Sequence, residues 1–386
     1  MEAGVAVLLV GLLLLALAVH PFITYPLSLR LLARMRPRPL RQGVPPMTAA
    51  LCVCAYNEEP VIRAKAENML AMRRAWPSLE LLVYVDAASD RTAEILREYE
   101  GDIRLVVSPA RRGKTHGMNT LVGMTAAELL VFSDANVSFA ADAVPRLLAP
   151  FADAEVGCVC GHLVYTGGDG HATAATGSLY WRLEEHIKAL ESATGSVMGA
   201  DGSIFAIRAS LHRAPPADLI DDMYISLAVL CGGARIVRAD DALAYEAAVS
   251  RPAEEFRRKV RIACQAFNVH RALRPALARM PLVDRYKYVS HKLLRWMAIY
   301  LLAGGGLFVL GGLALMQAWV PLLAIMGLGA VGGVLMAAAS SGLPATLRDV
   351  LGAFVATGIG VLRSVRGERF QTWNPPASAR ALAGKS

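Results

Sequence analysis

The sequence predicts an α/β domain placed between membrane helices. Short apolar runs alternate with helical segments over residues 47–250, which is the pattern of a sheet with a parallel centre. Long apolar runs flank this region at residues 5–29, 296–316 and 319–339. The composition agrees, because 55% hydrophobic residues in a chain of 386 is too apolar for an ordinary soluble protein. We therefore expect a polar domain and a membrane part in one chain.

The first apolar run predicts a membrane helix over residues 1–30. With His20 neutral, no formal charge occurs between Glu2 and Arg30, and the run exceeds the roughly 20 residues that cross a bilayer. A signal peptide would carry basic residues before its apolar run, whereas here they follow it in a basic linker over residues 31–46. The positive-inside rule then places the N-terminus outside and the following domain in the cytoplasm.

Residues 47–250 are expected to form the cytoplasmic domain. Two early helices are indicated by apolar spacing at residues 61–74 and 92–99, and Asp90 is a candidate N-cap for the second. Short β-prone runs predict strands over residues 49–55, 81–86, 104–107, 129–133, 156–160 and 204–207.

The rest of the chain predicts a return to the membrane. Residues 251–294 are predicted to form an amphipathic interfacial region, and residues 295–340 a transmembrane hairpin turning at Gln317-Ala318. For residues 341–386 we expect an interfacial or re-entrant helix and a tail. The apolar run 350–362 is short, and its trailing arginines resist export. A fourth span over this run is the alternative.

Charge and cysteine content exclude two other classes of site. The net charge of +8 comes from cations gathered beside the apolar runs, which indicates membrane flanks and not a nucleic-acid surface. The pairs Cys52-x-Cys54 and Cys158-x-Cys160 lie on predicted strands. We interpret them as buried thiols and not as metal ligands.

Carboxylates mark the predicted site. Asp86 and Asp134 each end a short apolar run, and the pair Asp221-Asp222 borders another. Acids at the carboxyl ends of parallel strands converge on the crevice where open α/β sheets bind ligands. Such acids are well placed to hold a complex of a metal ion and a nucleotide.

Six short motifs then carry a family resemblance. In chain order they are Ala55-Tyr56-Asn57-Glu58-Glu59, Val85-Asp86-Ala87-Ala88-Ser89-Asp90-Arg91-Thr92, Gly113-Lys114, Ser133-Asp134-Ala135-Asn136, Gly199-Ala200-Asp201-Gly202 and Asp221-Asp222. The ordered set resembles membrane-integrated family 2 glycosyltransferases, of the bacterial exopolysaccharide synthase group that is similar to poly-N-acetylglucosamine, hyaluronan and cellulose synthases. The resemblance implies a Rossmann-like, nucleotide-sugar-binding domain of the GT-A type.

The resemblance also implies a donor site. Its residues would be Tyr56, Glu58, Asp86, Lys114 and Asp134. Asp134 and Asn136 occupy the metal slot, where oxygen ligands suit Mg²⁺ or Mn²⁺. Asn136 departs from the family's second Asp and is a weaker ligand. The plainer interpretations are that Asp86 begins a turn and that Lys114 belongs to a solvated basic loop.

The expected general base is Asp222, with Asp221 as its positional companion. A carboxylate can take the proton of an acceptor hydroxyl as it attacks the anomeric carbon, and the family's direct attack inverts that centre. The pair could instead cap a helix starting at Met223. The resemblance assigns Asp201, Gly202 and Arg261 to the acceptor, although residues 258–262 lack the Trp of the processive relatives.

These observations predict an inverting glycosyltransferase at the bacterial inner membrane. It would move a sugar from a UDP-sugar of the UDP-GlcNAc or UDP-Glc type to a growing exopolysaccharide. Single transfer to a lipid or lipid-linked acceptor is an alternative, and a catalytically weak binding subunit of an export complex is another. The expected partners are the lipid bilayer and either further copies or export proteins, but no nucleic acid.

Two C-terminal features leave alternatives open. His291-Lys292 lies near the second membrane segment and is either structural or in contact with a phosphate. Residues 369–373 loosely resemble the mobile loop that covers the nucleotide in cellulose and hyaluronan synthases, and Trp373 could equally be an interfacial anchor.

Overall fold

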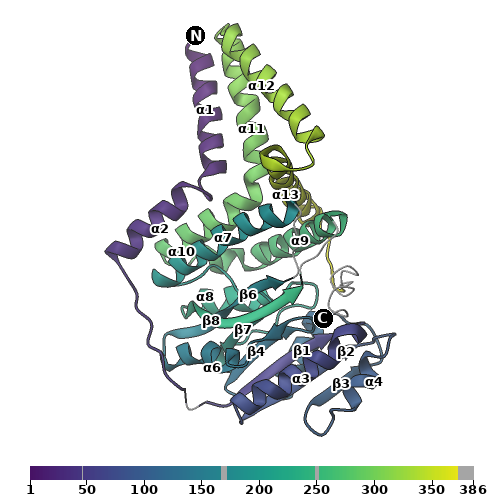
Figure 1. The fold of residues 1–386 in the computed structure, drawn as a ribbon. Coiled ribbons are helices and arrows are strands. Elements are labelled where there is room, and N and C mark those ends of the chain that lie inside the picture. The colour runs from purple at the N-terminus through teal and green to yellow at the C-terminus, as the bar shows by residue number, and fades with distance from the viewer. Residues whose placement is uncertain (46, 167–171, 248–251, 373–386) are drawn as a thin grey trace.

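The computed structural model describes residues 1–45, 47–166, 172–247 and 252–372. From one end to the other, the molecule consists of the projecting membrane helices, a middle group of helices, and the sheet with the helices that cover it (Figure 1). The strands are β1 Ala49–Ala55, β2 Leu79–Asp86, β3 Arg104–Ser108, β4 Leu129–Asp134, β5 Ser138–Phe139, β6 Val156–Thr166, β7 Ile204–Arg208 and β8 Arg235–Ala247. The α-helices are α1 Glu2–Val19, α2 Thr24–Met35, α3 Glu59–Ala75, α4 Thr92–Arg97, α5 Lys114–Val122, α6 Ala143–Leu148, α7 Ala172–Ala193, α8 Asp221–Cys231, α9 Pro252–Leu277, α10 Leu282–Tyr288, α11 Leu294–Leu315, α12 Trp319–Ala338 and α13 Gly342–Val365.

The strands form one mixed sheet in the order β3-β2-β1-β4-β7-β6-β8-β5. Strands β1 to β4 are parallel to one another, and β7 runs antiparallel to both β4 and β6. Cys54 of β1 pairs with Tyr84 on one side and with Asp134 on the other, so Asp86 and Asp134 reach the same edge of the sheet. All six expected strands form, whereas β5 and β8 were not expected.

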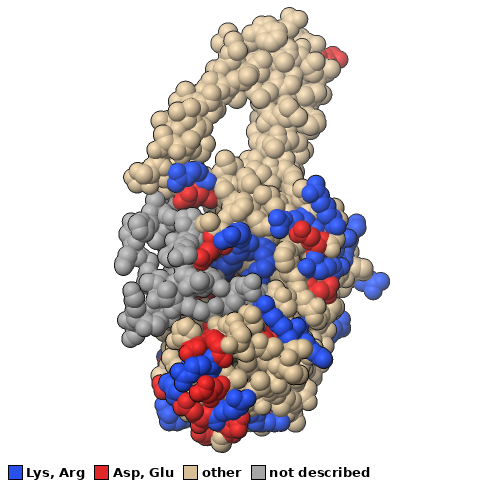
Figure 2. Space-filling model, turned by 90° about the vertical axis from the view of Figure 1, so that its right-hand side faces the viewer, with Lys and Arg blue, Asp and Glu red and all other residues tan. Residues whose placement is uncertain are grey.

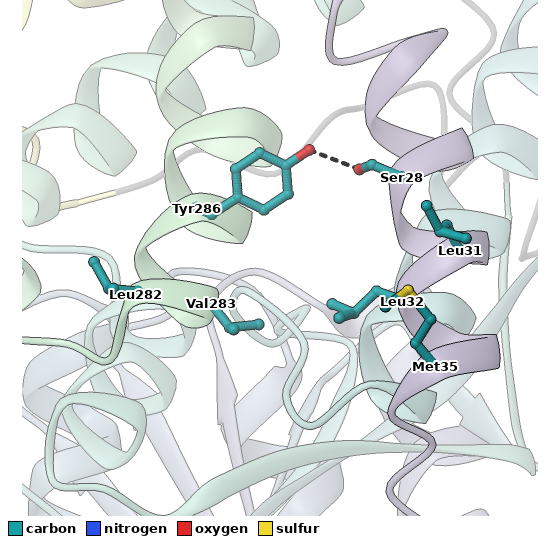
Figure 3. Close-up of a pocket in the computed structure, with 7 residues that line it drawn as sticks. All are labelled: Ser28, Leu31, Leu32, Met35, Leu282, Val283 and Tyr286. Atoms are coloured by element: carbon teal, nitrogen blue, oxygen red, sulfur yellow. Dashed lines mark hydrogen bonds between the residues drawn. The ribbon is translucent and has the colours of Figure 1, made fainter.

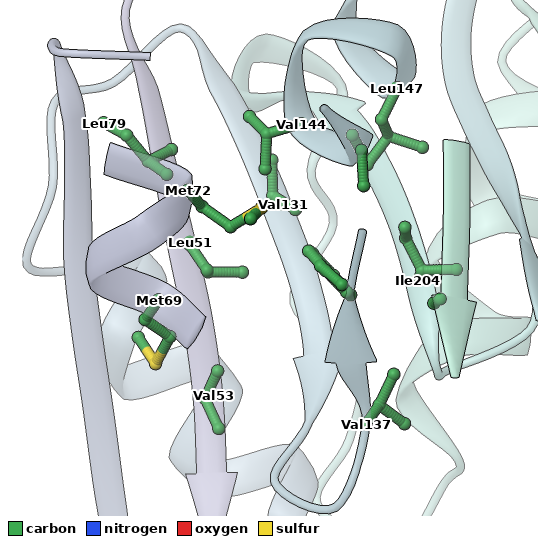
Figure 4. Close-up of a cluster of buried hydrophobic side chains, with 14 of the residues drawn as sticks. Leu51, Val53, Met69, Met72, Leu79, Val131, Val137, Val144, Leu147 and Ile204 are labelled. Carbon is green, nitrogen blue, oxygen red and sulfur yellow. The ribbon is translucent and has the colours of Figure 1, made fainter. Parts of the chain in front are cut away.

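Both faces of the sheet are buried. On one face, α3 and α6 pack Met69, Met72 and Val144 against β1 and β4 (Figure 4). The other face is covered by α5, α8 and α9, with Met118 and Leu121 in its core. The cysteines of β1 and β6 are buried in this second core with free thiols, as the strand pattern predicts, at positions Cys52, Cys54, Cys158 and Cys160. Burial raises the pKa of the Cys52 thiol to about 12.

The N-cap of α4 differs by one position from the expectation. Arg91, and not Asp90, is the N-cap residue of α4. Asp90 nevertheless accepts hydrogen bonds from the backbone N–H of Thr92 at 3.0 Å and of Glu59 at 3.0 Å. One carboxylate thus satisfies donors in the first turns of both α3 and α4, which ties the two helices beside the ends of β1 and β2.

The helices α1 and α11 pack through glycines. A methyl group on Gly11 would lie 2.7 Å from the backbone N of Val309, and one on Gly312 would lie 2.7 Å from the backbone N of Leu8. Such small residues allow membrane helices to approach closely. Gly4 lies against Met316, so the N-terminus and the Gln317-Ala318 turn share the end farthest from the sheet (Figure 1).

Within the described residues, four segments are long and apolar enough to cross a membrane. They are α1, Leu282–Leu315, α12 and α13. The projecting helices show almost no charged side chains, whereas the body below them is rich in both signs (Figure 2). Of α12, only Leu322 is buried. These features indicate membrane association.

The membrane part differs from the expectation in two places. The helix expected over residues 1–30 ends at Val19, and a separate amphipathic helix, α2, follows it. The break at residues 20–23 separates the uniformly apolar α1 from a segment that carries Arg30 and Arg34 on one side. Helix α13 is longer than the run 350–362 and packs its Gly360 against Ala263 and Cys264 of α9. Its interfacial placement stays a prediction.

Candidate active site

A lysine and three carboxylates gather at the edge of the sheet. Lys114 begins α5, and its Nζ lies 2.7 Å from Asp134 Oδ1 and 3.4 Å from Asp221 Oδ2. Burial alone would lower the pKa of Lys114, but the carboxylates of Asp134, Asp221 and Asp222 raise it well above the ordinary value. The ammonium therefore stays charged where a diphosphate leaving group would need a countercharge.

Asp222 lies beside this lysine in the first turn of α8. Its Oδ1 accepts the Met223 N–H at 2.6 Å, but α8 begins at Asp221 with Ile220 as its N-cap residue, so the alternative in which the pair caps a helix starting at Met223 is wrong. Its Oδ2 faces Gly202, where a methyl group would come within 2.8 Å. Burial and then the charge of Asp221 raise the pKa of Asp222 to about 7, against the opposite effect of Lys114. A carboxylate with this pKa can accept a proton near neutral pH.

Asp86 is fully buried and holds the basic loop. Its two oxygens accept the backbone N–H groups of Arg112 at 2.7 Å and Gly113 at 2.9 Å. Gly113 has a φ of 91°, which favours glycine, and the next residue is Lys114. Asp86 therefore fixes the backbone that leads into Lys114, which is more than the start of a turn. Its contact with a nucleoside stays a prediction.

Tyr56 and Glu58, which follow β1, contact the basic loop and the start of α4. The guanidinium carbon of Arg111 lies 3.7 Å from the centre of the Tyr56 ring, a stacked cation–π contact. Glu58 is buried, and its backbone N–H donates to Thr92 Oγ1 at 2.8 Å. The basic loop and the end of β1 thus meet through Tyr56.

The two expected metal ligands, Asp134 and Asn136, lie at the end of β4 and directly after it. Asn136 directs its Nδ2 toward Glu246 Oε1 at 3.0 Å, which leaves its amide oxygen for another partner. Among the residues described, no three His, Cys, Asp or Glu side chains form a ready ligand cluster. Asp134 already binds one cation, the ammonium of Lys114. A hard divalent cation held by Asp134, the Asn136 oxygen, substrate phosphate and water fits this donor set.

Lys65 lies beneath this slot and was not among the predicted residues. Its Nζ donates to Ser133 Oγ at 2.8 Å and to the carbonyl of Val137 at 2.7 Å, at the two ends of the loop that carries Asp134 and Asn136. Burial lowers its pKa to about 7. A signal was present, because Lys65 interrupts the apolar face of α3 between Ile62 and Met69.

The predicted acceptor residues reach the site from two directions. Gly202 lies against Asp222 Oδ2, and its neighbour Asp201 forms an ion pair with Lys188 of α7. Arg261 of α9 donates to Gln265 Oε1 at 3.2 Å. Burial and then Arg258 lower its pKa, while Asp134 and Asp222 act in the opposite direction. These two carboxylates thus lie within electrostatic reach of Arg261.

The segment after α13 lies on the basic loop. Gln371 donates from Nε2 to the carbonyl of Arg112 at 3.1 Å, and its own carbonyl closely approaches Gly113. Gln265 donates to the carbonyl of Phe370 at 3.1 Å. The described part of the expected mobile loop is therefore next to Lys114, and Trp373 lies outside the described residues.

His291 belongs to a different cluster. It is fully buried, with Nδ1 2.7 Å from Glu191 and Nε2 3.0 Å from Glu184. Arg295 also forms an ion pair with Glu184. This favours the structural interpretation of His291, in a polar network that joins α7 to the base of α11.

The sheet order and the strand-end acids define a domain of the GT-A type. A mannosyltransferase from Pyrobaculum calidifontis, in complex with GDP-Man and Mn²⁺, shares this fold with a TM-score of 0.72. The likeness covers 94% of this chain and 99% of that chain at 19% sequence identity.

A family model matches part of the sequence. Residues 50–214 match the model of glycosyl transferase family 2, so the chain contains a glycosyltransferase family 2 domain. The match ends before Asp221 and Asp222. Two curated relatives are an N-acetylglucosaminyltransferase of Rhizobium meliloti, 26% identical over 50% of this chain, and one of Rhizobium sp. strain N33, 24% identical over 60%. The chain spans about half of their length, 49% and 54%.

Proposed function

We propose that the protein is an inverting glycosyltransferase that uses a UDP-sugar at the inner membrane and acts from the cytoplasmic side. The observation that carries the proposal is the contact of Lys114 with Asp134 and Asp221, with Asp222 and Gly202 beside them. This arrangement puts a fixed cation and a carboxylate with a pKa of about 7 in one place. The two groups match the two demands of glycosyl transfer, which are a stabilised leaving group and a proton acceptor.

The reaction follows from these positions. An acceptor hydroxyl oxygen attacks the anomeric carbon, and the bond from that carbon to the diphosphate oxygen breaks. Asp222 takes the hydroxyl proton, while the bonding electrons leave with the nucleoside diphosphate. Lys114 holds the charge that develops on the diphosphate. Gly202 leaves room for the acceptor beside Asp222 Oδ2.

A divalent cation, Mg²⁺ or Mn²⁺, would be held by Asp134 and the amide oxygen of Asn136. When bound, it neutralises charge on the donor phosphates. Lys65 keeps the loop between Ser133 and Val137 in place beneath these ligands. Chelator should abolish transfer, and Asp134→Ala should abolish it as well. Transfer in excess chelator would contradict the metal assignment.

The choice of donor rests on the relatives. The curated relatives are named N-acetylglucosaminyltransferases, which supports UDP-GlcNAc as the first donor to test. The mannosyltransferase with the same fold was solved with GDP-Man, so a guanosine donor is the necessary comparison. A growing exopolysaccharide is the proposed acceptor, and export would need further copies or partner proteins because the described residues contain only four candidate membrane spans.

A lipid-linked acceptor is the second candidate, and one groove favours it. The groove has a volume of about 330 Å³ and lies between α2 and α10, next to the base of the membrane helices (Figures 1 and 3). Its walls are apolar except for the Ser28 and Tyr286 hydroxyls, which hydrogen-bond to each other at 2.6 Å. An acyl or isoprenoid chain fits such a surface.

One experiment separates these acceptors. Purified protein is incubated with UDP-GlcNAc, UDP-Glc or GDP-Man, and the products are resolved by size and by organic extraction. A ladder formed from a UDP-sugar supports the polymer, and one extractable species supports the lipid-linked acceptor. Release of no nucleotide from any donor would contradict the proposed activity and favour the binding subunit.

A further inference from the structure

Two aromatic rings lie near the site and have no part in the mechanism above. Tyr165 of β6 and Trp181 of α7 meet edge to face, with ring centroids 5.2 Å apart and an interplanar angle of 71°. Trp181 is partly buried, and Tyr165 keeps 39% of its surface exposed. An exposed aromatic face is an apolar platform on which the C–H face of a pyranose ring can stack.

Tyr165 is connected to the metal slot through Glu246. Tyr165 pairs in register with Glu246 across the parallel strands β6 and β8, so their side chains point to the same face of the sheet. Glu246 accepts the hydrogen bond from Asn136 Nδ2. A single side chain therefore separates Tyr165 from the residue that shares the slot with Asp134.

Trp181 is connected to the predicted acceptor loop through Lys188. Lys188 Nζ lies 5.1 Å from the centre of the Trp181 ring and also forms the ion pair with Asp201. Asp201 directly precedes Gly202, which faces Asp222. Trp181 is thus one side chain away from the loop that borders the general base.

Charged groups surround the rings. Burial raises the pKa of the Tyr165 hydroxyl to about 12, and the charges of Glu246, Arg258 and Asp201 also act on it. Aromatic faces with a few convergent polar groups are typical of sites that bind small polar ligands. By contrast, residues 258–262 contain no aromatic side chain, although Arg261 lies within electrostatic reach of Asp134 and Asp222.

We propose that Tyr165 and Trp181 form a stacking subsite for a pyranose ring of the acceptor. The inference rests on the proposed glycosyl transfer and adds the class of acceptor, which is a saccharide chain and not a bare lipid phosphate. The subsite lies between the metal slot and the acceptor loop. Arg258 and Asp201, each already in an ion pair, are the charged groups beside the rings, and no aromatic residue of α9 is needed.

The test measures saccharide binding without catalysis. In Asp222→Asn protein, isothermal titration calorimetry with the β-1,4 tetramer of N-acetylglucosamine should detect binding. Tyr165→Ala in this background should weaken it about tenfold, and Tyr165→Phe should leave it within about twofold, because the ring provides the contact. Trp181→Ala should weaken binding to a similar extent.

Tyr245 provides a matched control. It is 37% exposed, and it pairs with Val164 on the opposite face of the same two strands. Tyr245→Ala should leave the tetramer affinity unchanged. Equal affinity in the Tyr165→Ala and parent proteins would overturn the subsite. So would weakened binding of UDP-GlcNAc with unchanged tetramer binding, because the rings would then serve the donor.

The subsite and the proposed function can fail separately. Tetramer binding that depends on Tyr165, in a protein that transfers no sugar from any donor, would support the subsite and contradict the transferase. Transfer to the tetramer with the same KM in wild-type and Tyr165→Ala proteins would support the transferase and contradict the subsite. Absence of tetramer binding to the parent at millimolar concentration would overturn the subsite directly.

Discussion

The two halves of the sheet hold their functional groups in different ways. In the parallel half, β1 to β4, backbone amides bind Asp86 and a backbone carbonyl binds the buried Lys65. In the half made by β6, β7 and β8, Tyr165 and Glu246 meet their partners through side chains. Backbone contacts fix a position closely, whereas long side chains adjust. Substitutions in the first half should therefore change chemistry and stability, and those in the second half should change binding.

The largest effect is expected at Asp222, in the first turn of α8. Asp222→Asn keeps the shape but cannot accept a proton, so transfer should fall by about 10³-fold while donor binding is retained. Asp221→Asn should lower transfer less, because Asp221 acts only through the effect of its charge on its neighbours. The measurements are UDP release and UDP affinity. Loss of UDP affinity in Asp222→Asn, with residual transfer in proportion, would make this residue a donor ligand.

Gly202→Ala should have the next largest effect. The added methyl group would lie 2.8 Å from Asp222 Oδ2 and 3.3 Å from Lys114 Nζ, so the base or the acceptor must move. A displacement of this kind costs about 10²-fold in kcat. Gly101→Ala is the control, because a methyl group there meets no atom within 4 Å. Comparable kcat values for the two variants would show that the acceptor does not pass Gly202.

The pH dependence should follow Asp222. Only the carboxylate form is a base, so kcat/KM should rise with pH up to an apparent pKa of about 7 and fall about tenfold per unit below it. Lys65 also has a pKa of about 7. The same profile in Lys65→Met would assign the titration to Asp222. A profile that becomes flat in Lys65→Met would assign it to the lysine instead.

Lys65→Met should change stability in a pH-dependent way. The folded pKa lies below the ordinary value of 10.5, so the unfolded chain binds more protons between about pH 7 and 10.5 and stability rises with pH in this window. The variant should lose that rise. It also leaves Ser133 and Val137 without their donor, which should lower the melting temperature and weaken metal activation. An unchanged slope of melting temperature against pH would mean that folding does not lower the pKa of Lys65.

The smallest effect is expected at the metal slot. Asn136→Asp adds a carboxylate oxygen beside Asp134, which should preserve transfer and lower the half-saturating Mg²⁺ or Mn²⁺ concentration a few-fold. The new carboxylate also faces Glu246, and this repulsion limits the gain. Metal titrations of UDP release would measure it. An unchanged half-saturation would argue against Asn136 as a ligand.

The same comparison explains what could be predicted from the sequence. Asp86 and Asp134 end apolar runs, and neighbouring parallel strands bring such ends to one edge, so local patterns were sufficient. Tyr165 and Glu246 lie far apart in the chain and meet only through the register of β8 with β6, which is shifted at two irregularities. No local pattern predicts such a register. Trp181 and Lys188 lie seven residues apart on α7, and only the contact of Lys188 with Asp201 connects them to the acceptor loop.

The membrane part shows a related limit. Hydropathy predicted the α11–α12 hairpin closely, since length and apolarity define a span. It merged α1 and α2, because residues 20–23 are uncharged and the break between two helices leaves no mark in hydropathy. The amphipathic spacing of Ser28, Leu31, Leu32 and Met35 was the available sign of a separate helix.

The glycine contacts between α1 and α11 impose an order on biosynthesis. Gly11 and Gly305 are roughly 290 residues apart in the chain, so at the usual speed of translation α1 is made about 15–60 s before its partner. During that interval α11 is not yet available to the glycine face of α1, and the whole sheet domain leaves the ribosome. Closure of the glycine contact between α1 and α11 therefore comes after synthesis of the sheet domain.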